Sequence, residues 1–319
     1  MKIGIIGAGN VGSATAFSLL TTGIARKIVL LDNNEPKACA EALDISHASP
    51  FFHAGKIKSG TYQNLKGCKI IIITAGANQK PGETRTDLLE RNIKIFEYII
   101  PQISQHAPDS IMIIASNPVD IMTHVAIQLS GFPKERVFGS GTVLDSSRFR
   151  TLLGYYLNVS PKSVHANVLG EHGDSEVLIW SNADAGTIQI EKLAKAINKP
   201  LTPEAKNKID SCVRNSAYQI ISGKGATYYG IAGSLNRICQ AISSNEHAIL
   251  TVSAFHENIE NINNICISYP CIIGKRGIIG KLHPSFNQEE KKSLYESAYK
   301  IAELTKKATS IINKNNIEN

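Results

Sequence analysis

The sequence predicts an α/β protein in which a doubly wound parallel sheet is followed by a second unit of mixed helices and strands. In the first half, short runs of β-branched and other apolar residues alternate with helix-like stretches; beyond about residue 140 this alternation stops. Alternating strands and helices are typical of a parallel sheet with right-handed crossovers. We therefore predict two domains, residues 1–140 and residues 141–319.

Four near-continuous apolar runs are the predicted strands of the first domain. They are rich in isoleucine, valine and leucine with little polar alternation, as expected for strands buried on both faces of a parallel sheet. Helices are expected to start near Val11, Leu88 and Val119, the last directly after Pro118. The four runs are residues 3–6, 28–31, 70–73 and 111–114.

The second domain has a less regular pattern. A helix is predicted over about residues 144–157, followed by a strand over residues 164–169, and an Asn-rich, strand-like stretch covers residues 261–273. The last helix opens with a capping box at residues 287–290, because Asn and Glu at this spacing can satisfy each other's backbone N–H groups. Its apolar stripe consists of Leu294, Ala298, Ile301 and Ala308.

Composition excludes several classes of protein. With 319 residues, 43% hydrophobic and 19% charged, the chain can bury a large core and matches neither a disordered nor a fibrous protein. Its apolar runs are too short to cross a bilayer. Lys2 precedes an apolar stretch, but glycines interrupt that stretch at once, which argues against a signal peptide. We predict a cytoplasmic protein that does not bind membranes.

The cysteines and the net charge bear on metal binding, redox state and nucleic-acid binding. Six cysteines form neither a C-x-x-C pair nor a cluster with histidines at zinc spacing, so we predict reduced thiols and no metal site. The formal charge of +7 raises nucleic-acid binding as an alternative, which rests on net charge alone because the basic residues are scattered. A positive field also steers small anions, and we predict no nucleic-acid partner.

A dinucleotide fingerprint follows the first predicted strand, where residues 7–12 read Gly-Ala-Gly-Asn-Val-Gly. Gly7 permits the tight turn, Gly9 lets the backbone approach a pyrophosphate, and Gly12 allows close packing of helix and strand. The pyrophosphate would meet the N-terminus of the following helix. Asp32 ends the second strand, where it can accept hydrogen bonds from ribose hydroxyls and would repel a 2′-phosphate. The pattern predicts a Rossmann-type domain that binds NAD.

Four longer segments are distinctive: residues 74–85, 116–120, 141–148 and 170–174, the last of which reads Gly-Glu-His-Gly-Asp. These segments resemble those of bacterial L-lactate dehydrogenases of the lactate/malate dehydrogenase family. They occur in that family's order and spacing, and the similarity runs from the first strand to the last helix. The resemblance implies an NAD-dependent oxidoreductase with a Rossmann-type domain followed by a mixed α+β substrate/catalytic domain.

The resemblance also implies the catalytic residues. His172 is expected to give and take the proton, since imidazole titrates near working pH, and Asp145 to fix its tautomer. Arg148 is the expected partner of the substrate carboxylate, a role suited to a planar fork of donors. Arg85 is expected to polarise the ketone and stabilise developing negative charge.

Substrate choice is expected to depend on Gln79, which stands where malate dehydrogenases of the family carry arginine. Burying the second carboxylate of oxaloacetate without a cation is costly, so a neutral glutamine favours pyruvate and lactate. Asn117 and Thr227 are the other expected substrate contacts. Malate dehydrogenase, or a broader 2-hydroxyacid dehydrogenase of this fold, remains the first alternative. A non-catalytic dinucleotide-binding or structural protein is an alternative from another class.

Cofactor contacts and regulation are further implications of the resemblance. It assigns an effector pair, Arg150 and His165, to a homotetramer activated by fructose 1,6-bisphosphate. Arg150 lies two residues beyond Arg148, about 200° around a helix. His165 precedes His172 by an odd number of residues, so in a strand it would face the opposite way. The implied NAD contacts are Gly7, Gly9, Val11, Gly12, Asp32, Lys37, Tyr62, Gly76, Ala77, Asn117 and Ser140.

Overall fold

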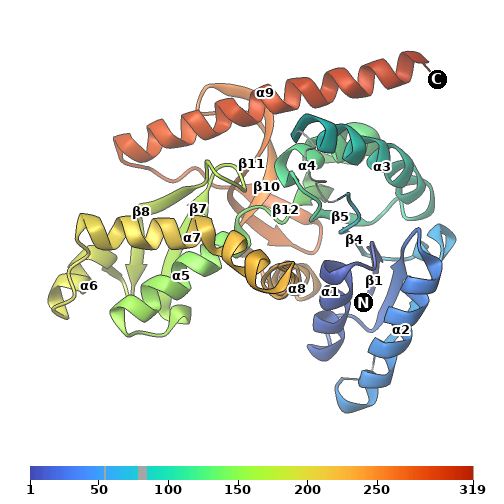
Figure 1. Cartoon of the computed structure of the whole chain (residues 1–319), viewed down its shortest axis with the longest axis horizontal. Coiled ribbons are helices and arrows are strands. Elements are labelled where there is room, and N and C mark those ends of the chain that lie inside the picture. The colour runs from blue at the N-terminus through green and yellow to red at the C-terminus, as the bar shows by residue number, and fades with distance from the viewer. Residues whose placement is uncertain (54, 78–84, 319) are drawn as a thin grey trace.

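The protein has the predicted α/β fold, with a large sheet that joins both halves of the chain (Figure 1). The structure, a computed structural model, describes residues 1–53, 55–77 and 85–318, apart from the side chains of residues 85, 86 and 315–318. In Figure 1 the first half of the chain lies on the right and helices α5 to α7 lie on the left, while α9 runs along the top of both.

The described residues form a nine-stranded sheet in the order β12-β11-β10-β6-β5-β4-β1-β2-β3. Strands β1 to β6 are parallel, and they confirm the four predicted runs and add β3 and β6. These strands are β1 (Lys2–Ile6), β2 (Lys27–Leu31), β3 (Lys56–Ser59), β4 (Ile70–Ile73), β5 (Ile111–Ile114) and β6 (Val137–Gly139).

Burial on both faces explains why these strands are apolar throughout. In β4, Ile70 and Ile72 belong to one buried cluster, whereas Ile71 and Ile73 belong to the cluster on the opposite face. All four side chains are fully buried. Each such side chain contributes roughly 1.5–3 kcal/mol through removal from water, so a strand with a polar face could not occupy the centre of this sheet.

The order of the strands in the first half reverses between β1 and β4. The chain runs from β1 to β2 and β3, then returns to β4 on the other side of β1. In such a sheet, ligands bind outside the carboxyl ends of the strands at this switch point. The helices are α1 (Asn10–Thr21), α2 (Glu35–Ala48), α3 (Arg85–His106) and α4 (Val119–Ser130), and they confirm the helix starts predicted near Val11, Leu88 and Val119.

Strands from the second half extend the same sheet. β10 (Ala248–Ile259) pairs antiparallel with β6 through Ser253 and Gly139, and it is followed in the sheet by β11 (Ile262–Gly274) and β12 (Gly277–Lys281). β11 confirms the predicted Asn-rich strand. A separate sheet contains β7 (Val164–Leu169), β8 (Val177–Ala185) and β9 (Ile188–Gln189).

The last helix, α9 (Gln288–Glu318), connects the halves by packing on α3, α4, β8 and β11. Its predicted capping box is present: the Glu290 N–H donates to Asn287 Oδ1 at 2.8 Å, and the Asn287 N–H donates to Glu290 Oε2 at 3.2 Å. The predicted apolar stripe is buried. The other helices are α5 (Val143–Leu157), α6 (Ile190–Ala196), α7 (Pro203–Lys224) and α8 (Tyr229–Ser243).

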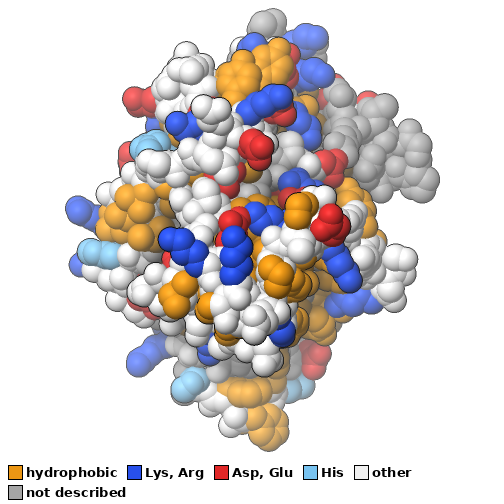
Figure 2. All heavy atoms as spheres, turned by 90° about the vertical axis from the view of Figure 1, so that its left-hand side faces the viewer, with side chains coloured by type: hydrophobic (Ala, Val, Ile, Leu, Met, Phe, Trp, Pro, Cys, Tyr) orange, Lys and Arg blue, Asp and Glu red, His pale blue; other side chains and the backbone are white. Residues whose placement is uncertain are grey.

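The surface in Figure 2 shows basic, acidic and apolar side chains interspersed over the face that lies to the left in Figure 1. This face therefore gives the nucleic-acid alternative little support, because such binding requires a basic patch or stripe. Among the residues described, none forms a helix that is both long and apolar enough to span a membrane.

Candidate active site

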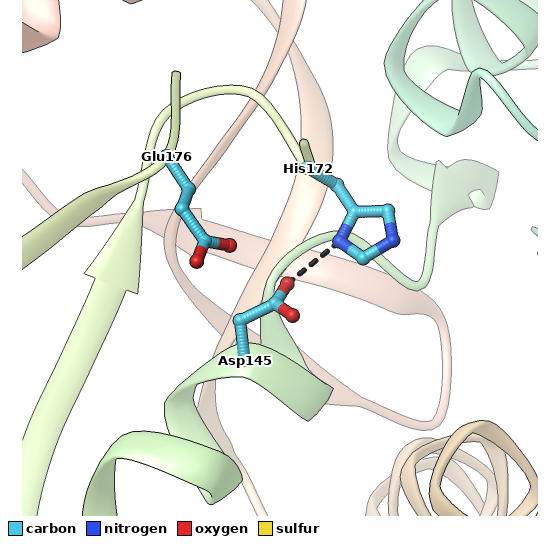
Figure 3. A group of neighbouring side chains, drawn as sticks. All are labelled: Asp145, His172 and Glu176. Atoms are coloured by element: carbon cyan, nitrogen blue, oxygen red, sulfur yellow. Dashed lines mark hydrogen bonds and ion pairs between the residues drawn. The ribbon is translucent and has the colours of Figure 1, made fainter. Parts of the chain in front are cut away.

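His172 and Asp145 meet at the junction of α5 with the loop between β7 and β8 (Figure 3). Asp145 lies in the first turn of α5, and its side chain is only 1% exposed. Its Oδ2 is 2.6 Å from Nδ1 of His172, whose side chain is 26% exposed. Because Nδ1 bonds to Asp145, the other ring nitrogen, Nε2, is the one available to a substrate.

Arg148 shares the carboxylate of Asp145. It lies one helical turn after Asp145, on the same face of α5, and its Nη1 donates to Asp145 Oδ1 at 2.7 Å. A guanidinium has five donors, so this bond leaves others with which to bind a carboxylate ligand. The structure thus brings together three of the predicted site residues, Asp145, Arg148 and His172.

The electrostatics of this group favour a charged imidazole. The charge of Asp145 outweighs the opposing effect of burial and raises the pKa of His172 to about 9. Burial opposes ionisation of Asp145, but the charges of His172 and Arg148 prevail and hold its pKa below the ordinary value. At neutral pH the free protein therefore carries an imidazolium that can donate a proton from Nε2.

Asp120 binds the backbone of His172 and was not among the predicted site residues. It lies in the first turn of α4, is buried, and its Oδ2 accepts the backbone N–H of His172 at 2.8 Å. Its Oδ1 accepts the hydroxyl of Ser253 on β10 at 2.5 Å. Burial raises the pKa of Asp120 to about 6. The available signal was its place in the 116–120 segment, directly after the apolar strand.

Glu176 is a second residue that the sequence analysis missed. It precedes β8, is 4% exposed, and completes a cluster with Asp145 and His172 in which one polar atom of each lies within 4.8 Å of the others. Such a spacing could hold a metal ion, but the Asp145 carboxylate already binds both His172 and Arg148. We therefore interpret the group as a proton-transfer site.

A cavity of about 1060 Å³ opens at the switch point between β1 and β4. Gly7, Gly9, Asp32, Lys37, Tyr62 and Gly76 line it, which are six of the predicted cofactor contacts. Lys94, Tyr98 and Gln102 of α3 also line it and were not predicted. They are polar residues within an amphipathic helix, where they resemble an ordinary solvated face.

The glycine loop fits the predicted dinucleotide. Gly7 has φ of +107°, which a side chain would strain, and a Cβ on Gly12 would lie 1.8 Å from the Gly7 carbonyl oxygen. A Cβ on Gly9 would instead point into open space, where a ligand can approach the backbone. Gly9 is also the N-cap of α1 and brings no side chain to the helix end, which favours binding of an anion there.

The Asp32 carboxylate is held in place at the end of β2. Its Oδ2 accepts the Ala8 N–H at 2.6 Å and its Oδ1 accepts the Asn34 N–H at 2.9 Å. These bonds orient the charge toward the glycine loop, beside the cavity. The position suits a carboxylate that binds ribose hydroxyls and repels a 2′-phosphate.

The other five predicted cofactor contacts are not among the residues that line this cavity. Val11 and Gly12 lie in the first turn of α1, and Ser140 is buried directly after β6. The other two meet at Asn92 of α3. Asn92 Oδ1 accepts the Ala77 N–H at 2.7 Å, and its amide donates to the Asn117 carbonyl oxygen at 2.9 Å.

Three further predicted substrate contacts are Gln79, Arg85 and Thr227. Gln79 lies outside the described residues, and Arg85 begins α3 but its side chain is not described. Thr227 is half-buried in the segment that joins α7 to α8. Their roles remain predictions from the sequence.

The predicted effector residues lie on neighbouring elements. Arg150 of α5 donates from Nε to the Ala166 carbonyl oxygen of β7 at 2.8 Å and from Nη2 to Asn167 Oδ1 at 2.9 Å. His165, the residue before Ala166, is exposed. Burial lowers the pKa of Arg150. Arg150 therefore contacts β7 at the two residues that follow His165, and the His165 side chain is exposed at the surface.

Comparisons with known proteins cover nearly the whole chain. Residues 1–139 match the family model of the lactate/malate dehydrogenase NAD binding domain, and residues 142–314 match that of the lactate/malate dehydrogenase alpha/beta C-terminal domain. The chain is 50% identical to the L-lactate dehydrogenase of Thermus aquaticus over 298 residues, which is 93% of this chain and 96% of that protein. It is 49% identical to that of Allorhizobium ampelinum over 304 residues, or 95% and 98% of the two chains.

Solved structures show the same similarity. A lactate dehydrogenase from a Medee basin deep-sea metagenome library superimposes with a TM-score of 0.94 at 37% identity, covering 97% of this chain and 98% of the other. The minor L-lactate dehydrogenase from Enterococcus mundtii, in its ligands-bound form, gives a TM-score of 0.92 at 38% identity over the same fractions.

Proposed function

The chain belongs to the lactate/malate dehydrogenase family, and on this basis we propose that it is an NAD-dependent L-lactate dehydrogenase, which interconverts pyruvate and (S)-lactate. The observation that carries the proposal is the arrangement at Asp145, whose carboxylate binds His172 through one oxygen and Arg148 through the other. A proton donor and a carboxylate-binding cation are thereby placed side by side. NAD, when bound, supplies or accepts the hydride.

The residues of the chain account for the other requirements of the reaction. Arg148 binds the pyruvate carboxylate and orients the ketone toward Nε2 of His172. His172 donates its proton from Nε2 to the ketone oxygen, and Asp145 keeps Nδ1 protonated and stabilises the imidazolium beforehand. Arg85 polarises the ketone, with Asn117 and Thr227 as further substrate contacts. In the direction of lactate oxidation, neutral His172 takes the hydroxyl proton at the same atom.

A panel of 2-oxo acids tests the proposed function. The absorbance change of NADH is followed with pyruvate, oxaloacetate and longer 2-oxo acids, and pyruvate is expected to have the highest kcat/KM. A preference for oxaloacetate would favour the malate dehydrogenase alternative. Absence of turnover with every acid would favour a non-catalytic dinucleotide-binding protein.

Cofactor choice follows from Asp32. We expect kcat/KM for NADH to exceed that for NADPH by about 100-fold at saturating pyruvate, or ~2.7 kcal/mol, because the fixed carboxylate repels the 2′-phosphate. Asp32→Ser should narrow this ratio, since it removes the charge while keeping a hydrogen-bonding group. Equal efficiencies of the wild-type enzyme with both cofactors would contradict the assignment.

The effector and the assembly are part of the proposal. We place fructose 1,6-bisphosphate at Arg150 and His165 of a homotetramer in the cytoplasm, where the six free cysteines stay reduced. The contact of Arg150 with β7 beside His165 supports this pairing. Two-fold pairing of subunits would bring two arginines and two histidines together, which suits a ligand with two phosphates. The family-model boundaries at residues 139 and 142 support the division into domains 1–140 and 141–319.

Titration with fructose 1,6-bisphosphate tests this effector site. We expect the pyruvate half-saturation to fall and the molar mass to shift toward the tetramer as the effector is added, because binding across subunits favours the assembled form. His165→Ala should weaken both responses while the contacts of Arg150 with β7 persist. No response in the wild type, or a full response in the Arg150→Ala/His165→Ala variant, would contradict the proposal.

A further inference from the structure

Glu176 is a buried acid beside the catalytic pair, and neither the fold nor the proposed reaction yet explains it. Its side chain points toward Asp145 in Figure 3, and only 4% of the residue is exposed. Its backbone N–H donates to the Gly173 carbonyl oxygen at 3.1 Å, which closes the turn that directly follows His172. Among the described residues, its buried Oε1 has no hydrogen-bond partner.

Charged groups surround Glu176 from three elements. Asp145 and Arg148 face it from α5, and His172 and Asp174 belong to its own loop. Arg214 of α7 pairs with Asp210 and donates from Nη1 to the Asp174 carbonyl oxygen at 3.0 Å. Asp120 of α4 contacts the same loop, because its carboxylate accepts the backbone N–H of His172.

Asp145 and Glu176 are neighbouring carboxyl groups that are both buried, and two such groups do not ionise equally. Asp145 is held ionised by its bonds to His172 and Arg148. Burial, together with the charge of Asp145, raises the pKa of Glu176 to about 8, although the cations His172, Arg214 and Arg148 oppose the rise. Glu176 is therefore mostly neutral at pH 7 and ionises in the range where His172 loses its proton.

We propose that Glu176 is a positioning residue for the proton on His172: its carboxyl group is buried within 4.8 Å of the catalytic pair, where its negative charge favours the proton-donating imidazolium. The proposal rests on the proposed dehydrogenase function. A negative charge appearing within 4.8 Å of the catalytic pair favours the imidazolium over the neutral ring. Reduction of pyruvate, which needs the protonated ring, then continues to higher pH than the Asp145–His172 pair alone would allow.

The Glu176→Gln variant tests this role, because the amide has the shape of the protonated acid but cannot ionise. We expect the alkaline limb of kcat/KM for pyruvate with NADH to move about 0.5–1 pH unit lower, whereas efficiencies at pH 6.5 agree within about twofold. Superimposed profiles would overturn the proposal. So would a loss of efficiency that is equal at every pH, since that indicates a packing role only.

Glu171→Gln is the matched control. Glu171 lies on the same loop, but its carboxylate binds Lys300 of α9 at 2.7 Å and the Ser175 hydroxyl instead of the catalytic pair. Its substitution should leave the alkaline limb in place, and an equal shift in both variants would overturn the proposal. If Glu176→Gln does not fold, Glu176→Met, which is neutral and of similar length, serves the same comparison.

A titration of the His172 ring by NMR in histidine-labelled protein gives a readout that does not need turnover. The His172 signal, identified by its loss in His172→Asn, should titrate about 0.5–1 pH unit lower in Glu176→Gln than in the wild type. An unchanged titration would refute the role of Glu176. Failure of the wild type to reduce pyruvate would instead refute the proposed function, while the NMR titration would still report on Glu176.

Discussion

His172→Ala should lower kcat for pyruvate reduction by about 10³- to 10⁴-fold, because the substitution removes the proton donor Nε2. This corresponds to roughly 4–5.5 kcal/mol of transition-state stabilisation. The cavity at the switch point is built from other elements, so binding of NADH, measured by its fluorescence, should persist. Steady-state rates with saturating NADH and pyruvate give the comparison.

The control for this variant is His47→Ala, which removes an exposed histidine from the last turn of α2. Its rates should match those of the wild type. Near-normal turnover of His172→Ala would exclude the proton-transfer role. Loss of NADH binding in that variant would show that the substitution disturbs more than proton transfer.

Gln79→Arg should move the ratio of kcat/KM for oxaloacetate over pyruvate by about 10³-fold toward oxaloacetate. An arginine can pair with the second carboxylate, and a charge that is buried without such a partner typically costs about 2–5 kcal/mol. Pyruvate presents only a methyl group at this end and gains nothing from the cation. Initial rates with both acids, at fixed NADH, measure the change.

Gln79→Glu is the matched control, since it keeps the length of the side chain and reverses the added charge. It should disfavour oxaloacetate further, because two negative charges would then share the pocket. An unchanged acid preference in both variants would show that Gln79 does not contact the substrate, and that another feature of the chain sets its specificity.

Local patterns made much of the fold predictable. The central strands are recognisable because burial on both faces selects isoleucine and valine at every position, as in β4. The capping box of α9 depends only on residues within one turn. Strands β3 and β6 were missed because β3 reads Lys-Ile-Lys-Ser, with a single apolar residue, and β6 has three residues, too few for a periodic signal.

Contacts between distant segments could not be predicted in the same way. Asp120 and His172 are 52 residues apart in sequence and meet through one backbone hydrogen bond. Glu176 follows a polar turn and would ordinarily be a solvated carboxylate. It is instead buried, and the charges of Asp145 and Arg148 of α5 and of Arg214 of α7 act on it.

By itself, the sequence determined the parallel sheet, the glycine loop with Asp32, and the candidates His172, Asp145 and Arg148, because these depend on neighbouring residues or on a family pattern along the chain. Only the tertiary structure decided how their charges act. A pKa depends on burial and on charges within a few ångströms, and those charges come from α4, α5, α7 and the loop between β7 and β8. The raised pKa of His172 and the nearly neutral Glu176 are therefore consequences of packing between segments far apart in the sequence.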